Sequence, residues 1–121
     1  MEKNDLVYLL HIIDAIDKIE EYLSGVSEED FIASSLIQDG IIRQLGIVGE
    51  ATRHVTNDIR QMDSTVPWQD ISDMRNKLIH DYFGVDIDTV WVTANEDLSD
   101  LKRQVKGIIT VLAEQEENQP K

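Results

Sequence analysis

One short segment holds the densest set of side chains with catalytic chemistry. Between residues 73 and 82 the chain carries Arg75, Asn76, His80 and Tyr82. Asn76 and His80 are four residues apart, so on a helix they would share one face and could hydrogen-bond. His80 would lie about 140° around the helix from Arg75, which is awkward for a pair that acts within one chain. Two chains related by a twofold axis could instead bring two arginines and two histidines to one cleft.

Such a set of side chains is suited to cleaving RNA without a metal. Histidine titrates near neutral pH, so one ring could take the proton of the 2′-hydroxyl group and the other could protonate the departing 5′-oxygen. Arginine would stabilise the charge that develops on the phosphate. From the spacing alone, however, a plainer interpretation is favoured. Arg75 and His80 would then be surface residues at the end of a helix, where the helix dipole favours a histidine.

A second polar stripe comes earlier in the chain. Arg43, Glu50 and His54 are spaced by seven and four residues, so they would lie on one helical face. They could orient Arg75 and His80, or bind phosphate. Two other interpretations stay open: a solvated face of salt bridges worth a few tenths of a kcal/mol per pair, or a pair between Glu50 and Arg75 across the bundle.

The composition argues against a metal centre. The chain has no cysteine and only three histidines, and neither an HxxxH nor an HExxH spacing occurs. A catalytic zinc site is therefore not expected, and no metal or cofactor is predicted. Trp68 and Trp91 stand beside apolar positions that should face inward, so we expect core residues and not a platform for stacking bases.

Helical periodicity predicts the elements that must carry these side chains. Apolar stripes indicate long helices over residues 6–23, 35–54 or 35–57, 68–80 and 86–115, with a short turn of helix within 57–62. The residues expected to face inward on the first three are Leu6, Leu9, Leu10, Ile13, Ile16, Ile19 and Leu23, then Ile37, Ile41, Leu45, Val48, Thr52 and Val55, then Ile71, Met74 and Leu78. Glycines at 40, 46 and 49 suggest close backbone packing of the second helix, because glycine is costly inside a helix. Ser27 and Asp86 or Asp88 are predicted to cap helices. The short connections favour an all-α, antiparallel bundle of four to five helices. We expect residues 1–121 to form one domain, with 114–121 as a polar, frayed tail.

Charge limits the choice of partner. Twenty-four acidic and eleven basic residues give a net charge of −13. Proteins that bind nucleic acid usually carry a basic footprint, so RNA would have to be held by a local basic patch. The same acidity would suit a basic protein partner. The sequence has no apolar run of about 20 residues and begins with a polar segment, so a cytoplasmic location is expected, with no membrane partner.

Several segments, in order along nearly the whole chain, resemble the HepT toxins of the HEPN superfamily. Residues 75–82 resemble the R-x4-H-x-Y motif of that family, and residues 45–51 resemble its central IGEA segment. The other matching segments flank the motif: Pro67-Trp68, Tyr82 to Asp86, and Val90-Trp91.

The resemblance implies a HEPN-type bundle and a homodimer with a composite active site. It also implies a metal-independent endoribonuclease that acts on RNA and not DNA, as the toxin of a toxin–antitoxin pair. Arg75 and His80 would be catalytic, and Asn76, Arg43 and Glu50 would support them. The antitoxin would be an MntA-type minimal nucleotidyltransferase that inactivates the toxin by transferring AMP to Tyr82.

A rival hypothesis assigns no catalysis to the chain. It would be a helical adaptor or substrate-binding subunit of a nucleotidyltransferase. The acidic charge favours this rival, and the intact pair of Arg75 and His80 disfavours it.

Overall fold

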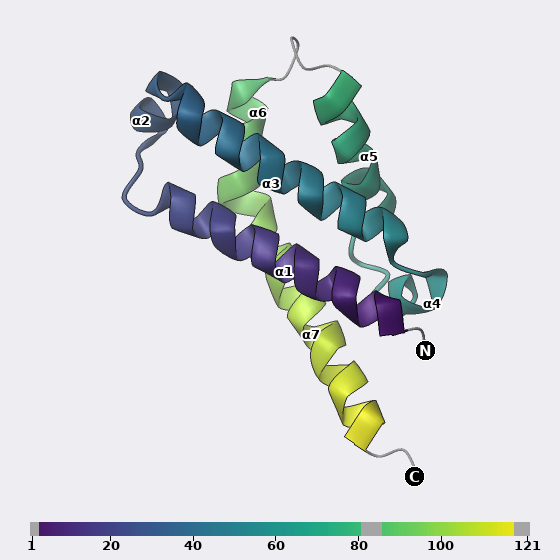
Figure 1. The fold of residues 1–121 in the computed structure, drawn as a ribbon. Coiled ribbons are helices and arrows are strands. Elements are labelled where there is room, and N and C mark those ends of the chain that lie inside the picture. Colours follow the sequence, from purple (N-terminus) through teal and green to yellow (C-terminus); the bar gives the residue numbers. More distant parts are fainter. Residues whose placement is uncertain (1–2, 81–85, 118–121) are drawn as a thin grey trace.

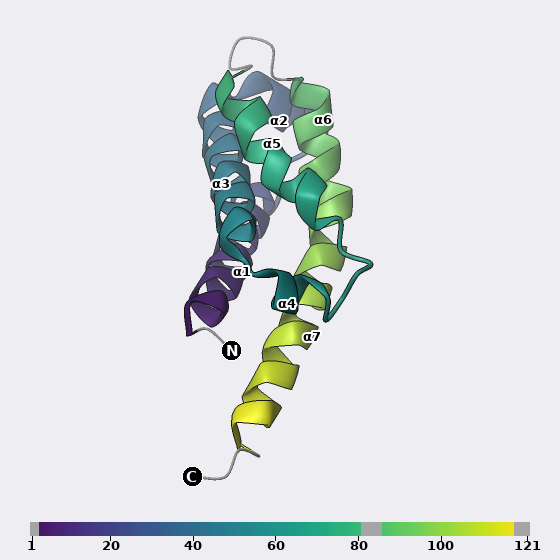
Figure 2. The same cartoon turned by 90° about the vertical axis from the view of Figure 1, so that its right-hand side faces the viewer.

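The chain folds into helices that pack as an antiparallel bundle (Figures 1 and 2). The structure is a computed structural model that describes residues 3–80 and 86–117. Within these ranges it contains helices and no strand, which confirms the predicted all-α class. The helices are α1 (Lys3–Leu23), α2 (Glu28–Ala33), α3 (Ser35–His54), α4 (Asn57–Arg60), α5 (Trp68–His80), α6 (Ile87–Val92), a π-helical turn η2 (Thr93–Asp97) and α7 (Leu98–Glu117).

The long helices pack in the order α5, α3, α1, α7. The α3 helix lies between α1 and α5, and α1 packs in turn against α7. The α6, η2 and α7 segments follow one another as a single long rod, which runs down the side of α1 (Figure 1). A lysine fastens this rod, because Lys102 Nζ pairs with Asp17 (2.8 Å) and Glu20 (3.0 Å) of α1. These hydrogen bonds and charges raise the pKa of Lys102.

The apolar stripes predicted from the sequence mostly form the core. On α3, Ile41, Leu45, Val48 and Thr52 are buried as expected. On α1 the expected stripe was wrong at Leu10, which is 47% exposed. The buried face of α1 is centred one position away, because this helix packs against α3 on one side and α7 on the other. Its buried apolar residues are Leu9, Ile12, Ala15, Ile16 and Ile19.

Local signals fix the helix ends. Ser27 begins α2 with a reciprocal capping box, because its hydroxyl accepts from the backbone N–H of Asp30 (3.1 Å) and its own N–H donates to the Asp30 carboxylate (3.3 Å). Asp86 caps α6 through the N–H of Asp88 (3.0 Å). Both predicted caps are confirmed. The last helix extends two residues past its expected end, so Glu116 and Glu117 belong to α7 and not to a tail.

The glycines of α3 suggested close packing, and the structure shows a close neighbour at Gly40 but not at Gly46. A Cβ at Gly40 would come within 3.4 Å of the Tyr22 ring, so this glycine does admit a close neighbour. A Cβ at Gly46 would meet nothing within 4 Å, so the expectation is wrong at that position within the described chain. Gly46 instead leaves an open notch in the surface of α3.

One arginine connects the end of α3 to the start of α5. Arg60 Nη2 donates to the carbonyl oxygen of Thr52 (2.9 Å), and Nε donates to that of Val55 (3.2 Å). These carbonyls lie at the C-terminal end of α3, where no further helical turn follows, and the Thr52 carbonyl also accepts from the Val55 N–H (3.1 Å). The same Nη2 also donates to the hydroxyl of Ser72 (3.3 Å), which is buried on α5.

The indole of Trp68 completes this connection. Trp68 is buried, and its Nε1–H reaches the carbonyl oxygens of Arg60 (3.1 Å) and Asp63 (3.0 Å). The Ser72 hydroxyl in turn donates to the Trp68 carbonyl (3.0 Å). The first turn of α5 is therefore held to the loop before it and to the end of α3. This confirms that Trp68 is a core residue.

We predict that Arg60→Ala lowers the free energy of unfolding by about 2–4 kcal/mol, because it removes charged donors from the Thr52 and Val55 carbonyls and from the buried Ser72 hydroxyl. Chemical denaturation monitored by circular dichroism measures this change. The matched control is Arg103→Ala, since Arg103 is exposed and pairs only weakly with Asp100 at the surface (3.2 Å). That control should change stability by less than about 0.5 kcal/mol. Equal effects of the two substitutions would contradict the proposed role of Arg60.

Candidate active site

The α5 helix carries the predicted catalytic residues. Its backbone is regular from Trp68 to His80, so Arg75 and His80 stand on one continuous helix, about 140° apart around its axis. Asn76 is exposed. The side chains of Arg75 and His80 and all of Tyr82 lie outside the described residues, so their roles stay predictions. The helical backbone has the geometry that the sequence predicted, with the two positions on different sides of α5.

The neighbouring face of α3 carries a polar cluster. Glu50 is half-buried, and its Oε1 accepts from Arg53 Nη2 (2.9 Å) and lies 3.1 Å from His54 Nε2. The Glu50 carboxylate raises the pKa of the Arg53 guanidinium through this hydrogen bond and through its charge. Arg43 lies on the same side of α3, two turns nearer its start, and is exposed. The predicted stripe therefore brings Glu50 and His54 together, and Arg43 extends it.

An aromatic contact ties this cluster to α1. The rings of Tyr8 and His54 stack with centroids 4.8 Å apart and planes 15° from parallel. The ring of His11 contacts the Tyr8 ring edge-on, with the two centroids 6.1 Å apart. Two of the three histidines thus have aromatic neighbours. Among the residues that the structure describes, no group of three histidine, aspartate or glutamate side chains could hold a metal ion.

Sequence reasoning missed two members of this cluster. Arg53 could have been found, because it follows Glu50 by three residues and such pairs meet on a helix. Tyr8 could not, because its contact with His54 joins residues 46 positions apart on different helices. The two halves of the predicted site lie on helices that pack directly against each other, α3 and α5.

Comparison with known proteins identifies the family. The model of the protein family described as "Ribonuclease HepT-like" matches residues 12–108. The chain belongs to the HepT-like ribonuclease family. The HepT-like segment includes every residue predicted for the active site, from Arg43 to Tyr82, and leaves out Tyr8 and His11.

Individual relatives agree with this assignment. The "Probable ribonuclease HepT" of Thermococcus cleftensis is 40% identical over 102 residues, which are 84% of this chain and 93% of that protein. A protein of Caldanaerobacter subterraneus subsp. tengcongensis, named as a "Putative RNase", is 38% identical over 84% of this chain and 91% of its own length. No solved structure matches this chain.

A longer relative contains a HepT-like part. The Methanocaldococcus jannaschii protein named "Gamma-glutamylcyclotransferase and putative RNase" is 36% identical over 118 residues. These residues are 98% of the present chain and 53% of that protein, so this chain spans about half of that relative's length.

We predict that Tyr8→Leu disturbs His54 specifically. The loss of the ring stack should lower the free energy of unfolding by about 0.5–1.5 kcal/mol. It should also remove the ring-current shift from the His54 ring protons, which proton NMR detects. Tyr22→Leu, which removes a ring on the far part of α1, is the control and should leave those resonances in place. Unchanged His54 resonances in Tyr8→Leu would contradict the observed stack.

Proposed function

We propose that this chain is the toxin of a toxin–antitoxin pair and that it cleaves RNA without a metal, in a composite active site at the interface of a homodimer. The observation that carries the proposal is the membership of the HepT-like ribonuclease family, with Arg75 and His80 five residues apart on α5. Two of the relatives described above are named as ribonucleases, and this chain matches more than nine-tenths of the length of each. These relatives support the proposed activity.

The geometry of α5 favours a shared active site. Because the positions of Arg75 and His80 lie about 140° apart around α5, the proposal assigns part of the set to a second chain. The outer face of α3 offers a surface for that chain. It exposes Leu36 (82%) and Arg43, and it has the open notch at Gly46 where another backbone can come close. In this arrangement both copies of α5 border one cleft.

The proposed reaction is an internal transfer. One His80 takes the proton of the 2′-hydroxyl group, and the 2′-oxygen then forms a bond to the neighbouring phosphorus. The bond from phosphorus to the 5′-oxygen breaks, and the His80 of the other chain protonates that oxygen. Arg75 stabilises the negative charge on the phosphate during the transfer. The products are a 2′,3′-cyclic phosphate and a free 5′-hydroxyl group.

The acidic surface makes a local basic patch necessary. Arg43 and Arg53 are exposed along the outer face of α3, beside the helix that carries Arg75. Together they would hold the phosphates next to the cleft. Because the whole chain has a net charge of −13, binding of RNA should be weak and should fall steeply with added salt.

The proposed control of the toxin is a covalent change at Tyr82. A partner nucleotidyltransferase would direct the phenol oxygen of Tyr82 to the α-phosphorus of ATP, with pyrophosphate as the leaving group. The added AMP places a phosphate and a base two residues from His80. Its phosphate can pair with Arg75 and take the place of the RNA backbone.

A non-catalytic adaptor of a nucleotidyltransferase is the second candidate function. The net charge of −13 favours it, because most of this surface repels RNA. The two candidates differ in whether the purified chain cleaves RNA.

We predict that the purified wild-type protein cleaves single-stranded RNA in the presence of EDTA and leaves 2′,3′-cyclic phosphate ends. His80→Ala and Arg75→Ala should each lower the rate by about 10²–10⁴-fold, because each removes a group that acts in the transition state. Gel analysis of end-labelled RNA gives the rate, and mass spectrometry identifies the ends. His11→Ala is the matched control and should retain activity. Cleavage that needs a divalent ion would refute the mechanism, and no cleavage at all would favour the adaptor.

We predict that Tyr82→Phe keeps the fold and the ribonuclease activity but escapes the antitoxin. Wild type and variant are incubated with the partner nucleotidyltransferase and ATP, weighed by mass spectrometry and then assayed for cleavage. Only the wild type should gain AMP and lose activity. Tyr8→Phe is the control and should be modified like the wild type. Equal modification of Tyr82→Phe, or full activity of the modified wild type, would contradict the proposed regulation.

A further inference from the structure

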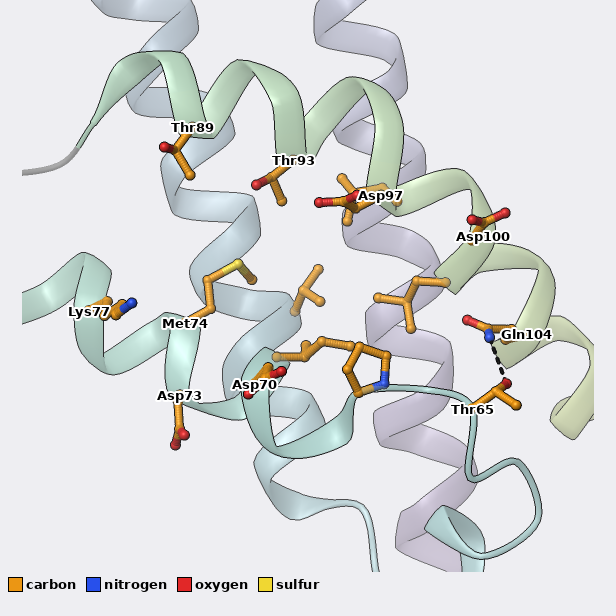
Figure 3. Close-up of a pocket in the computed structure, with 15 residues that line it drawn as sticks. Thr65, Asp70, Asp73, Met74, Lys77, Thr89, Thr93, Asp97, Asp100 and Gln104 are labelled. Atoms are coloured by element: carbon orange, nitrogen blue, oxygen red, sulfur yellow. Dashed lines mark hydrogen bonds between the residues drawn. The ribbon is translucent and has the colours of Figure 1, made fainter.

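The bundle is open along one edge. The α5 helix packs against α3, and α7 packs against α1, but α5 and α7 make few contacts with each other. A groove of about 650 Å³ fills this edge, with α5 as one wall and the rod as the other (Figure 3). At one end a hydrogen bond from Gln104 Nε2 to Thr65 Oγ1 (3.0 Å) links the two walls.

The floor of the groove is apolar. Ile71 and Met74 of α5 were expected to face inward, yet both are only half-buried, because nothing in the described chain covers them on the groove side. The rod contributes more buried apolar side chains to the same floor. The apolar lining consists of Val48, Pro67, Ile71, Met74, Leu98 and Leu101.

The walls of the groove are acidic. Four aspartates line it, from both sides, against one lysine, Lys77. Asp97 and Asp100 stand on the rod, and Asp70 faces them from α5 (Figure 3). Asp73 completes the set at the outer edge of α5. An apolar floor between acidic walls is complementary to a helix with one apolar face and basic flanks.

The π-helical turn aligns one wall. Thr89, Thr93 and Asp97 line the groove at intervals of four residues. In a regular α-helix each such step would turn by about 40° away from the groove. The wider turn at Thr93–Asp97 takes up part of this rotation, so the three side chains stay along one wall. Turns of this kind occur often at functional sites.

The described residues of the candidate active site do not line the groove. Arg43, Glu50 and Asn76 are absent from its lining, although Lys77, which lines it, directly follows Asn76 on α5. The four carboxylates of the groove would repel an RNA backbone. A second copy of this chain is also poorly matched, because its own net charge is −13.

We propose that this groove docks a basic, amphipathic helix of a partner protein. Apolar side chains of that helix would cover Ile71 and Met74, and lysine or arginine residues on its flanks would pair with Asp70, Asp97 and Asp100. The lining residues of the rod run from Thr89 to Gln104. That is a length of about 22 Å, enough for roughly four turns of a docked helix. The proposal does not depend on the ribonuclease activity.

The probe is an 18-residue amphipathic peptide of leucine and lysine, with leucine on one helical face. Its matched control has glutamate in place of every lysine. Methyl NMR of protein labelled at its methionines reports the site, because Met74 lines the groove and Met62 lies elsewhere, near the end of α4. The lysine peptide should shift the Met74 methyl signal and leave that of Met62 nearly unchanged, and the glutamate peptide should shift neither.

Charge variants test the walls of the groove. The combined variant Asp70→Asn, Asp97→Asn and Asp100→Asn should weaken binding of the lysine peptide by about tenfold or more. The control variant Glu114→Gln, Glu116→Gln and Glu117→Gln removes the same charge at the exposed end of α7. It should change the dissociation constant by less than about twofold. Circular dichroism verifies that both variants fold.

Three results would overturn the proposal. Equal weakening in both variants would mean that only net charge attracts the peptide. A Met74 signal that changes on dilution without peptide would mean that a second copy of the chain fills the groove. A single-stranded RNA that shifts Met74 and not Met62 would make the groove an RNA site. The proposal predicts that the Met74 methyl signal shifts only with the lysine peptide, and only when the three groove aspartates Asp70, Asp97 and Asp100 are present.

Discussion

The structure depends on how the end of α3 is satisfied. A helix leaves its last carbonyl groups without partners, and here Arg60 supplies charged donors to those of Thr52 and Val55. Because Arg60 also reaches Ser72, and its carbonyl accepts from Trp68, the same residue sets where α5 begins and which way it runs. Everything proposed for α5 rests on this junction, in which Trp68 lies about two turns before Arg75.

Because α5 is held in place at its first turn, its two sides have different surroundings. One side packs along α3, the helix that also carries the polar cluster of Glu50, Arg53 and His54. The other side stays open toward α7 and leaves Ile71 and Met74 half-covered in an acidic groove. Under the two proposals, RNA is cleaved at one surface while a basic partner binds at another. The strong negative charge then has a use, although it opposes RNA binding.

Local features could be predicted from the sequence, and distant contacts could not. The caps at Ser27 and Asp86 and the bounds of α3 and α5 follow from neighbouring residues, so periodicity and capping chemistry were enough. Leu10 was misplaced because the direction of the core depends on two other helices. The π turn in the last helix and the stack of Tyr8 on His54 leave no local pattern. The candidate residues Arg75, His80 and Tyr82 came from a motif, and their side chains lie outside the described residues.

The central claim is that two chains share the active site, and a mixed dimer tests it most directly. Differently tagged chains allow purification of a dimer with one wild-type chain and one His80→Ala chain. If one histidine acts as the base and the partner's acts as the acid, a single substitution disables the cleft, and the rate of RNA cleavage falls by about 10²-fold or more. A mixed dimer that retains half of the wild-type rate would show that each chain works alone, and would contradict the account.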